Sequence, residues 1–199
     1  MTSLNNRLAY LGIADFDYLS ARILLLDGLT FTGLPKAAEA FEKIVKLVLM
    51  LEAKISRNEE LTPGALRRFG HELGALLVEL RTRTAIPIAV DVDQYFAMLK
   101  DAAAHRYPEA WKEYEATLSI GQLDSLYAQL RNLAVANFPV EEKERARCFG
   151  TFIGDAYTPE TIEKIRELGG RSPWELLAYR NDSHEAFDLD HERRRPRIT

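Results

Sequence analysis

Residues 41–51 form the segment that most restricts how this chain can fold. If the segment is helical, apolar side chains point in almost every direction from its axis: Phe41, Ile44, Val45, Leu47, Val48, Leu49 and Leu51. Only a narrow polar strip interrupts the apolar surface of the predicted helix that contains this segment, and it is made of Glu39, Glu42, Lys43 and Lys46. Such a helix has to be covered by neighbours on several sides. We therefore predict that it lies at the centre of a helical bundle or at an interface between subunits.

The rest of the chain also carries helical patterns. Apolar residues recur with helical spacing in residues 66–80 and 123–134, and Thr-Pro or Ser-Pro pairs that start helices stand at 62–63, 158–159 and 172–173. Only residues 82–92 resemble a strand, so the predicted fold class is all-α. The predicted helices cover residues 5–27, 35–54, 62–83, 120–138, 139–154, 158–168 and 172–180, with short ones after Asp91 or Asp93 and at Pro108.

The length of 199 residues fits one domain with an appendage. We predict a helical bundle in residues 1–138, a helical extension packed on it in residues 139–190, and a basic, disordered tail in residues 191–199. We predict neither an internal repeat nor a low-complexity tract.

Composition excludes several classes of protein. Hydrophobic residues make up 47% of the chain, which is too many for a disordered protein. The net charge of −4 gives no overall attraction to nucleic acid or to an anionic membrane. Cys148 is the single cysteine, which suits a reducing compartment. No leader pattern opens the chain and no apolar run is long enough to span a bilayer, so we expect a cytoplasmic protein without membrane contact.

Four short segments resemble the HEPN superfamily of helical bundles. They are DYLSAR at 17–22, AAEAFEKIVK at 37–46, GHEL at 70–73 and HRYP at 105–108, and the resemblance covers about residues 10–135. It implies a four- or five-helix up-and-down bundle, commonly a homodimer. It also implies a nucleotide or RNA ligand, or a partner such as a nucleotidyltransferase or a toxin–antitoxin component.

Many proteins of that superfamily are metal-independent ribonucleases with an Arg-x4–6-His motif, and this sequence departs from the motif. After Arg131 the histidine would have to stand at 136–138, where the sequence reads ANF. After Arg180 it would have to stand at 185–187, and His184 comes one residue early. We therefore predict a non-catalytic binding or regulatory protein. A ribonuclease with a relocated site at Arg180 and His184 and a purely structural homodimer are the alternatives.

A ligand-binding site is predicted at two charged residues of the first helix. Asp15 and Arg22 fall within its apolar stripe, and a lone buried charge is costly, so each needs a partner. The polar strip of the second helix, with Lys43 and Lys46, is the expected source. These four residues are interpreted either as a pocket for a small anion or nucleotide, or as an ion network that fixes helix register.

A subunit interface is predicted on the third helix. His71, Gly74 and Val78 lie opposite its leucine stripe, and the two small residues would let another helix approach closely. An exposed polar face is the alternative. The polar run of residues 180–185 has no spacing of an established metal site, and the chain shows no phosphate-binding loop, so neither a metal nor a cofactor is predicted.

Overall fold

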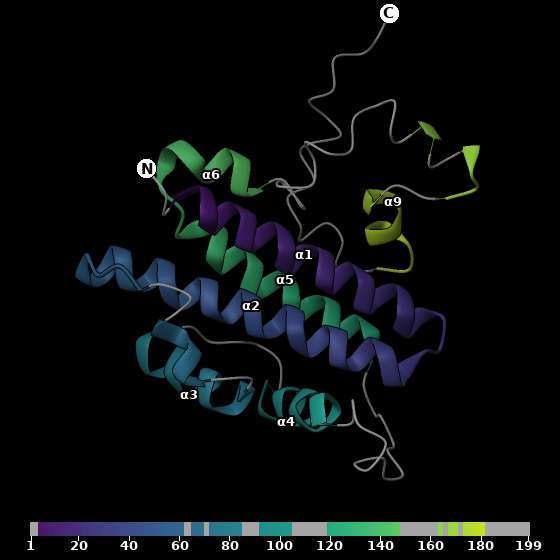
Figure 1. Ribbon diagram of the computed structural model, residues 1–199, viewed down its shortest axis with the longest axis horizontal. Coiled ribbons are helices and arrows are strands. Elements are labelled where there is room, and N and C mark those ends of the chain that lie inside the picture. Colours follow the sequence, from purple (N-terminus) through teal and green to yellow (C-terminus); the bar gives the residue numbers. More distant parts are fainter. Residues whose placement is uncertain are drawn as a thin grey trace, which may run out of the picture.

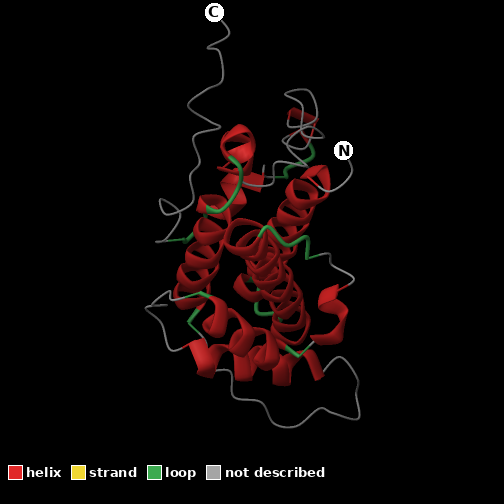
Figure 2. Cartoon of the chain, turned by 90° about the vertical axis from the view of Figure 1, so that its left-hand side faces the viewer, coloured by secondary structure: helices red, strands yellow, loops and turns green. Residues whose placement is uncertain are grey.

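The described part of the chain consists of helices and the loops that join them. The computed structural model describes residues 4–61, 65–69, 72–84, 92–104, 119–147, 163–164, 167–170 and 173–181. Within these ranges seven α-helices and one 3-10 helix are formed and no strand is present (Figure 2). The predicted all-α class is confirmed.

Three long helices lie side by side and form the body of the bundle: α1 (Leu4–Leu26), α2 (Thr30–Arg57) and α5 (Ile120–Ala136) (Figure 1). Helix α2 packs against α1, α3, α4 and α5. Its side chains from Ile44 to Leu51 are all buried, as is Phe41. The prediction that this segment is the central helix of a bundle is therefore confirmed, and neighbours within the chain cover it.

Shorter helices cover the two sides of this body. Helices α3 (Leu73–Arg83) and α4 (Val92–Ala104) pack against α2 and against each other. Helices α6 (Val140–Arg147) and α9 (Pro173–Ala178) pack against α1 on the other side (Figure 1). The core runs continuously through the bundle and includes Leu177 of α9 and Ala146 of α6.

Helix α2 begins earlier than the sequence predicts, at Thr30 instead of Pro35. The carbonyl of Leu29 accepts hydrogen bonds from the amides of Thr32 and Gly33, at 3.1 and 2.8 Å, and so starts the helix before the proline. Pro35 then lies in the second turn, where its missing N–H removes the bond to the carbonyl four residues before it and its ring crowds that carbonyl. The reversal between α1 and α2 is made by Gly28, whose φ of +78° is accessible to glycine at little cost.

The single helix predicted for residues 62–83 is wrong. Residues Ala65–Phe69 form a 3-10 helix, and Glu72 is not helical, with a ψ of 85°, so α3 begins at Leu73. The apolar residues of the predicted stripe still face the core, because Leu66, Leu73 and Leu80 are all buried. The expected helix at Pro108, residues 148–154, most of residues 158–168 and the basic tail of residues 191–199 lie outside the described residues.

Candidate functional site

Two ion pairs lie in the interior between α1 and α5, which run antiparallel. Arg131 binds Asp15 with two hydrogen bonds, from Nε to Oδ1 at 2.9 Å and from Nη2 to Oδ2 at 3.1 Å. Nε of Arg22 donates to both carboxylate oxygens of Asp124, at 3.0 and 3.1 Å. All four side chains are 0% exposed. Each arginine is therefore paired across the two helices and not along its own helix.

A pair of stacked tyrosines separates the two ion pairs. The rings of Tyr18 and Tyr127 are parallel to within 1°, with centroids 4.0 Å apart. The hydroxyl of Tyr18 donates to Asp124, and that of Tyr127 donates to Asp15 at 3.0 Å. Each aspartate is thus held by a tyrosine and an arginine from the opposite helix. We call these six residues the twin-motif cluster: Asp15, Tyr18, Arg22, Asp124, Tyr127 and Arg131.

The cluster has local two-fold symmetry because the same motif occurs on both helices. Residues 12–24 and residues 121–133 both read G-x2-D-x2-Y-x3-R-x-L. Positions i, i+3 and i+7 lie on one face of a helix, so the Asp, Tyr and Arg side chains of each copy point the same way. The prediction that the chain has no internal repeat is therefore wrong. This repeated motif is the signal that identifies Asp124, Tyr127 and Arg131, which the sequence-based site does not include.

The remaining donors of the two arginines reach backbone carbonyls of the short helices. Arg131 donates from Nη2 to the carbonyl of Ala146 at 3.1 Å and from Nη1 to that of Arg147 at 3.4 Å, both in the last turn of α6. Nη1 of Arg22 donates to the carbonyl of Leu176 in α9 at 3.0 Å. The last carbonyls of a helix lack partners within it and attract positive charge. The buried arginines thus join α6 and α9 to the bundle.

Burial sets the protonation state of the two stacked tyrosines. Desolvation raises the pKa of Tyr18 well above its usual value, and the neighbouring carboxylate of Asp124 raises it further. The pKa of Tyr127 is raised well above its usual value for the same reasons, with Asp15 as the neighbouring carboxylate. Both hydroxyls therefore keep their protons and act as hydrogen-bond donors within the cluster.

The expected partners of Asp15 and Arg22 are incorrect. The polar strip of α2 does not supply them, because Lys43 binds Asp17 at 2.5 Å and Lys46 binds Glu42 at 2.6 Å. Asp17 also forms an ion pair with Lys36, with Oδ1 and Nζ 2.6 Å apart. The structure therefore does not bring the four predicted ligand-binding residues into one set. Asp15 and Arg22 belong to the twin-motif cluster, and the two lysines belong to ion pairs of α1 and α2.

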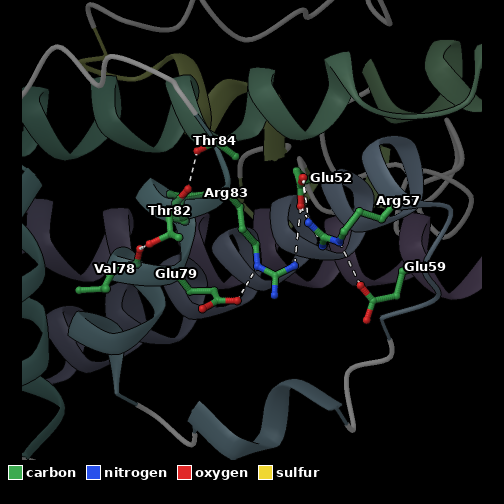
Figure 3. A network of polar contacts seen from close by, with 9 residues as sticks. Glu52, Arg57, Glu59, Val78, Glu79, Thr82, Arg83 and Thr84 are labelled. Carbon is green, nitrogen blue, oxygen red and sulfur yellow. Dashed lines mark hydrogen bonds and ion pairs between the residues drawn. The ribbon is translucent and has the colours of Figure 1, made fainter.

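A second polar network joins the end of α2 to α3 (Figure 3). Arg57 binds Glu52, with Nη2 and Oε2 3.2 Å apart, and Arg83 lies 4.0 Å from the same oxygen. Nε of Arg83 also donates to Glu79, within the same helix. Most of these charged groups are partly exposed, so each pair adds little to stability. The network links α3 to the end of α2.

The predicted interface residues that the structure describes lie on the outer face of α3. A Cβ added at Gly74 would have no heavy atom within 4 Å, and Val78 is 64% exposed. Figure 3 shows the Val78 side chain directed away from the Glu52–Arg83 network. His71 lies outside the described residues. Nothing in the described part of the chain covers Gly74, which leaves this face open to an external partner.

The residues of the alternative ribonuclease site are only partly described. Arg180 is exposed at the end of α9, with a left-handed φ of 50° and its guanidinium 5.4 Å from the centre of the Tyr179 ring. His184 lies outside the described residues. Among the described residues, no three His, Cys, Asp or Glu side chains are placed to share a metal ion.

Within the described ranges, no helix has both the length and the hydropathy needed to cross a bilayer. Comparisons with protein-family models, with curated proteins and with solved structures found no match for this chain.

Proposed function

We propose that this chain is a non-catalytic, HEPN-like helical binding protein. The observation that supports the proposal most directly is the burial of the twin-motif cluster. Asp15, Arg22, Asp124 and Arg131 are the kinds of side chain that do acid–base or phosphate chemistry, and they are 0% exposed and bound to one another. A catalytic group must reach its substrate. With α9 packed on α1, these four charges are shielded from solvent and hold helices together.

The ion pairs of α1 and α2 support the same proposal. The carboxylate of Asp17 lies between Lys36 and Lys43, and Lys46 is largely buried beside Glu42. A cation whose charge is already matched within the chain attracts an external phosphate less than a solitary one does. In our proposal, therefore, this surface is scaffold, and a partner is recognised elsewhere on the molecule.

We propose a second copy of the chain as one partner, packed across the outer face of α3. A glycine and an exposed valine one helical turn apart allow two helices to approach closely, and Gly74 has open space around its Cα. A nucleotidyltransferase or a toxin–antitoxin component is the further partner that the resemblance to HEPN proteins implies. The role in both cases is binding and regulation.

An RNA cleavage assay tests the non-catalytic part of the proposal. Highly purified wild-type protein is incubated with a labelled single-stranded RNA, beside Arg180→Ala and His184→Ala variants. We expect the same background cleavage from all three proteins. Cleavage by the wild type that both variants lose would overturn the proposal in favour of a ribonuclease with a relocated site.

Binding is tested by thermal unfolding in the presence of nucleotides and single-stranded RNA. A ligand that binds only the folded state raises the midpoint of unfolding as its concentration rises. A stabilised native state with intact RNA is the expected combination for a binding protein of the nucleotide or RNA class. A midpoint of unfolding that stays constant for every ligand would limit the proposal to protein partners. Binding of a second copy is then tested by comparing the sedimentation of the wild type with that of the Gly74→Arg variant.

A further inference from the structure

The two copies of the repeated motif differ in how completely their arginines are used. Arg131 has acceptors for Nε and for both terminal nitrogens: Asp15 and two carbonyls of α6. In Arg22, Nε is bound to Asp124 and Nη1 to the carbonyl of Leu176. Its Nη2 is buried and has no hydrogen-bond acceptor within the described part of the chain. The asymmetry is confined to one atom of an otherwise matched pair.

A buried guanidinium nitrogen without an acceptor is unusual in a folded protein. Folding removes the nitrogen from water and breaks its hydrogen bonds to water. This costs free energy unless another acceptor replaces the water. At Arg131 the fold provides acceptors for Nε and for both terminal nitrogens, so the motif itself allows all three nitrogens of its arginine to be hydrogen-bonded. The unused donor at Arg22 therefore points to an acceptor that comes from outside the helices around it.

The short helix α9 is the element next to this donor. It has only six residues, Pro173–Ala178. Among the side chains of α9 that the structure describes, Leu177 is buried and Leu176 is partly buried. Glu175 and Ala178 are exposed. Segments with few buried apolar contacts open locally at a small fraction of the global unfolding free energy. Detachment of α9 removes the Leu176 carbonyl and frees Nη1 beside Nη2, while Asp124 still holds Nε.

We propose that Arg22 is a binding residue for a small oxyanion and that α9 gates it. Nη1 and Nη2 form the end of the guanidinium fork, whose spacing matches two oxygens of a carboxylate or a phosphate group. The anion replaces the carbonyl of Leu176 at Nη1 and gives Nη2 its acceptor. Because α9 must detach first, the apparent affinity is set by the fraction of molecules in which α9 is open. This site deepens the proposed function by naming a ligand class.

The test uses the full chain and two probes, inorganic phosphate and acetate, at constant ionic strength. Binding is followed by the NMR signal of the Arg22 Nε–H group, and opening of α9 by hydrogen exchange of its amides. Leu177→Ala removes a fully buried side chain of α9, and Leu168→Ala changes a side chain that is 88% exposed. We expect the dissociation constant of one or both probes to fall by about tenfold in Leu177→Ala, as a tenfold larger open fraction requires, and to stay unchanged in Leu168→Ala.

The repeated motif supplies a matched pair of variants that locates the site. Lysine keeps the positive charge but lacks the planar fork, so Arg22→Lys is expected to lose binding of both probes. Arg131→Lys makes the same change in the other copy and is expected to leave binding intact. If Arg22→Lys does not fold, the Leu177→Ala comparison still decides. Preference for phosphate or for acetate identifies the source of the oxyanion.

Failure of this inference is distinguishable from failure of the proposed function. If α9 exchanges rapidly in Leu177→Ala and neither probe shifts the Arg22 signal, Arg22 is no anion site and its buried donor meets only water. That result leaves the binding-protein proposal standing. RNA cleavage in the earlier assay would overturn the proposed function whatever the probes do.

Discussion

At the scale of single residues, each buried aspartate is held by two donors from the opposite helix. Asp124 accepts from Arg22 and from Tyr18, and all three side chains lie away from solvent. Breaking one partner of a buried ion pair costs more than replacing the whole group with apolar side chains, because the remaining charge stays buried without compensation. A variant that removes one partner and a variant that replaces the whole group with apolar side chains therefore separate these effects.

We expect Asp124→Leu to lower the free energy of unfolding by about 3–5 kcal/mol, because it leaves the Arg22 guanidinium buried and unpaired. The triple variant Tyr18→Phe/Arg22→Met/Asp124→Leu removes all three polar side chains of this half of the cluster at once. Only the Leu176 carbonyl then loses its donor, so we expect most of the stability to return. Urea unfolding measures both. A triple variant as unstable as the single one would show that the ion pair itself stabilises the fold.

The tyrosines make the fold sensitive to alkaline pH. The folded pKa values of Tyr18 and Tyr127 lie well above those of the unfolded chain, so their contribution to stability is complete below the unfolded pKa of about 10. It is lost as the pH rises through the folded values, because the unfolded state then releases protons that the folded state keeps. Burial also raises the pKa of Tyr10, to about 12.

We therefore expect Tyr18 and Tyr127 to ionise only together with unfolding. Ultraviolet absorbance of tyrosinate, followed beside near-ultraviolet circular dichroism, measures the two processes in one titration. The Tyr18→Phe/Tyr127→Phe variant should lose this cooperative part of the absorbance change. Ionisation of both tyrosines in a protein that keeps its native dichroism would contradict the burial of the cluster.

Sequence reasoning at this scale found two of the six residues of the cluster. The cost of a buried charge identified Asp15 and Arg22 correctly as residues that need partners. It could not choose the partner helix, because a helical pattern gives the direction of a side chain but not the neighbour that it meets. The second motif at Asp124 and Arg131 resolves this choice only when the two helices are compared position by position.

At the scale of helices, glycines decide how closely neighbours approach. A Cβ at Gly33 of α2 would lie 2.7 Å from Cγ and 3.1 Å from the backbone nitrogen of Leu25 in α1. The first turns of α2 therefore touch α1 at a distance that only glycine permits. Gly74 in α3 has open space instead.

The same substitution at these two glycines should have opposite effects. We expect Gly33→Ala to lower the free energy of unfolding by about 1–3 kcal/mol, because the methyl group pushes α1 and α2 apart. Gly74→Ala should raise the free energy of unfolding of the monomer by about 0.5 kcal/mol, since alanine favours a helix and its methyl group meets nothing within the described part of the chain. Thermal unfolding of both variants provides the comparison. Stabilisation by Gly33→Ala would mean that Leu25 moves aside without cost.

Helix boundaries were predicted well where side chains decide them and poorly where the backbone does. The bounds of α1 and α5 agree with the predicted ranges to within two residues. The start of α2 and the break at Glu72 depend on backbone hydrogen bonds and torsion angles that no apolar pattern reports. Ser119 precedes α5, and its side chain makes no capping bond to the helix.

At the scale of the whole molecule, the outer face of α3 is where we expect a second copy. Gly74→Arg adds a long charged side chain there without disturbing the monomer. If our proposed homodimer forms through this face, the variant should sediment as a monomer in analytical ultracentrifugation. Ala75→Arg adds the same charge to a neighbouring exposed position, about 100° round the helix, and should leave the dimer intact. Equal sedimentation of wild type and Gly74→Arg would place any dimer contact elsewhere.

The overall architecture follows from the sequence because it depends on one property that a pattern can report. A segment such as residues 41–51, apolar on nearly every side, has to be surrounded. The position of the candidate site does not follow in the same way. Which of several polar residues share a buried space depends on the alignment of α1 with α5, and that alignment appears only when the chain is folded.

The repeated motif also restricts the ways in which this chain can misfold. Sliding α5 along α1 by one helical turn, about 5.4 Å, would carry both arginines past their aspartates and separate the two rings. One turn before and after Asp15 stand Leu11 and Leu19. A slip of one turn would therefore place the charged Arg131 side chain against a leucine. A slip of one turn therefore breaks both ion pairs at once. The six residues thus favour one alignment of α5 along α1 when the bundle assembles.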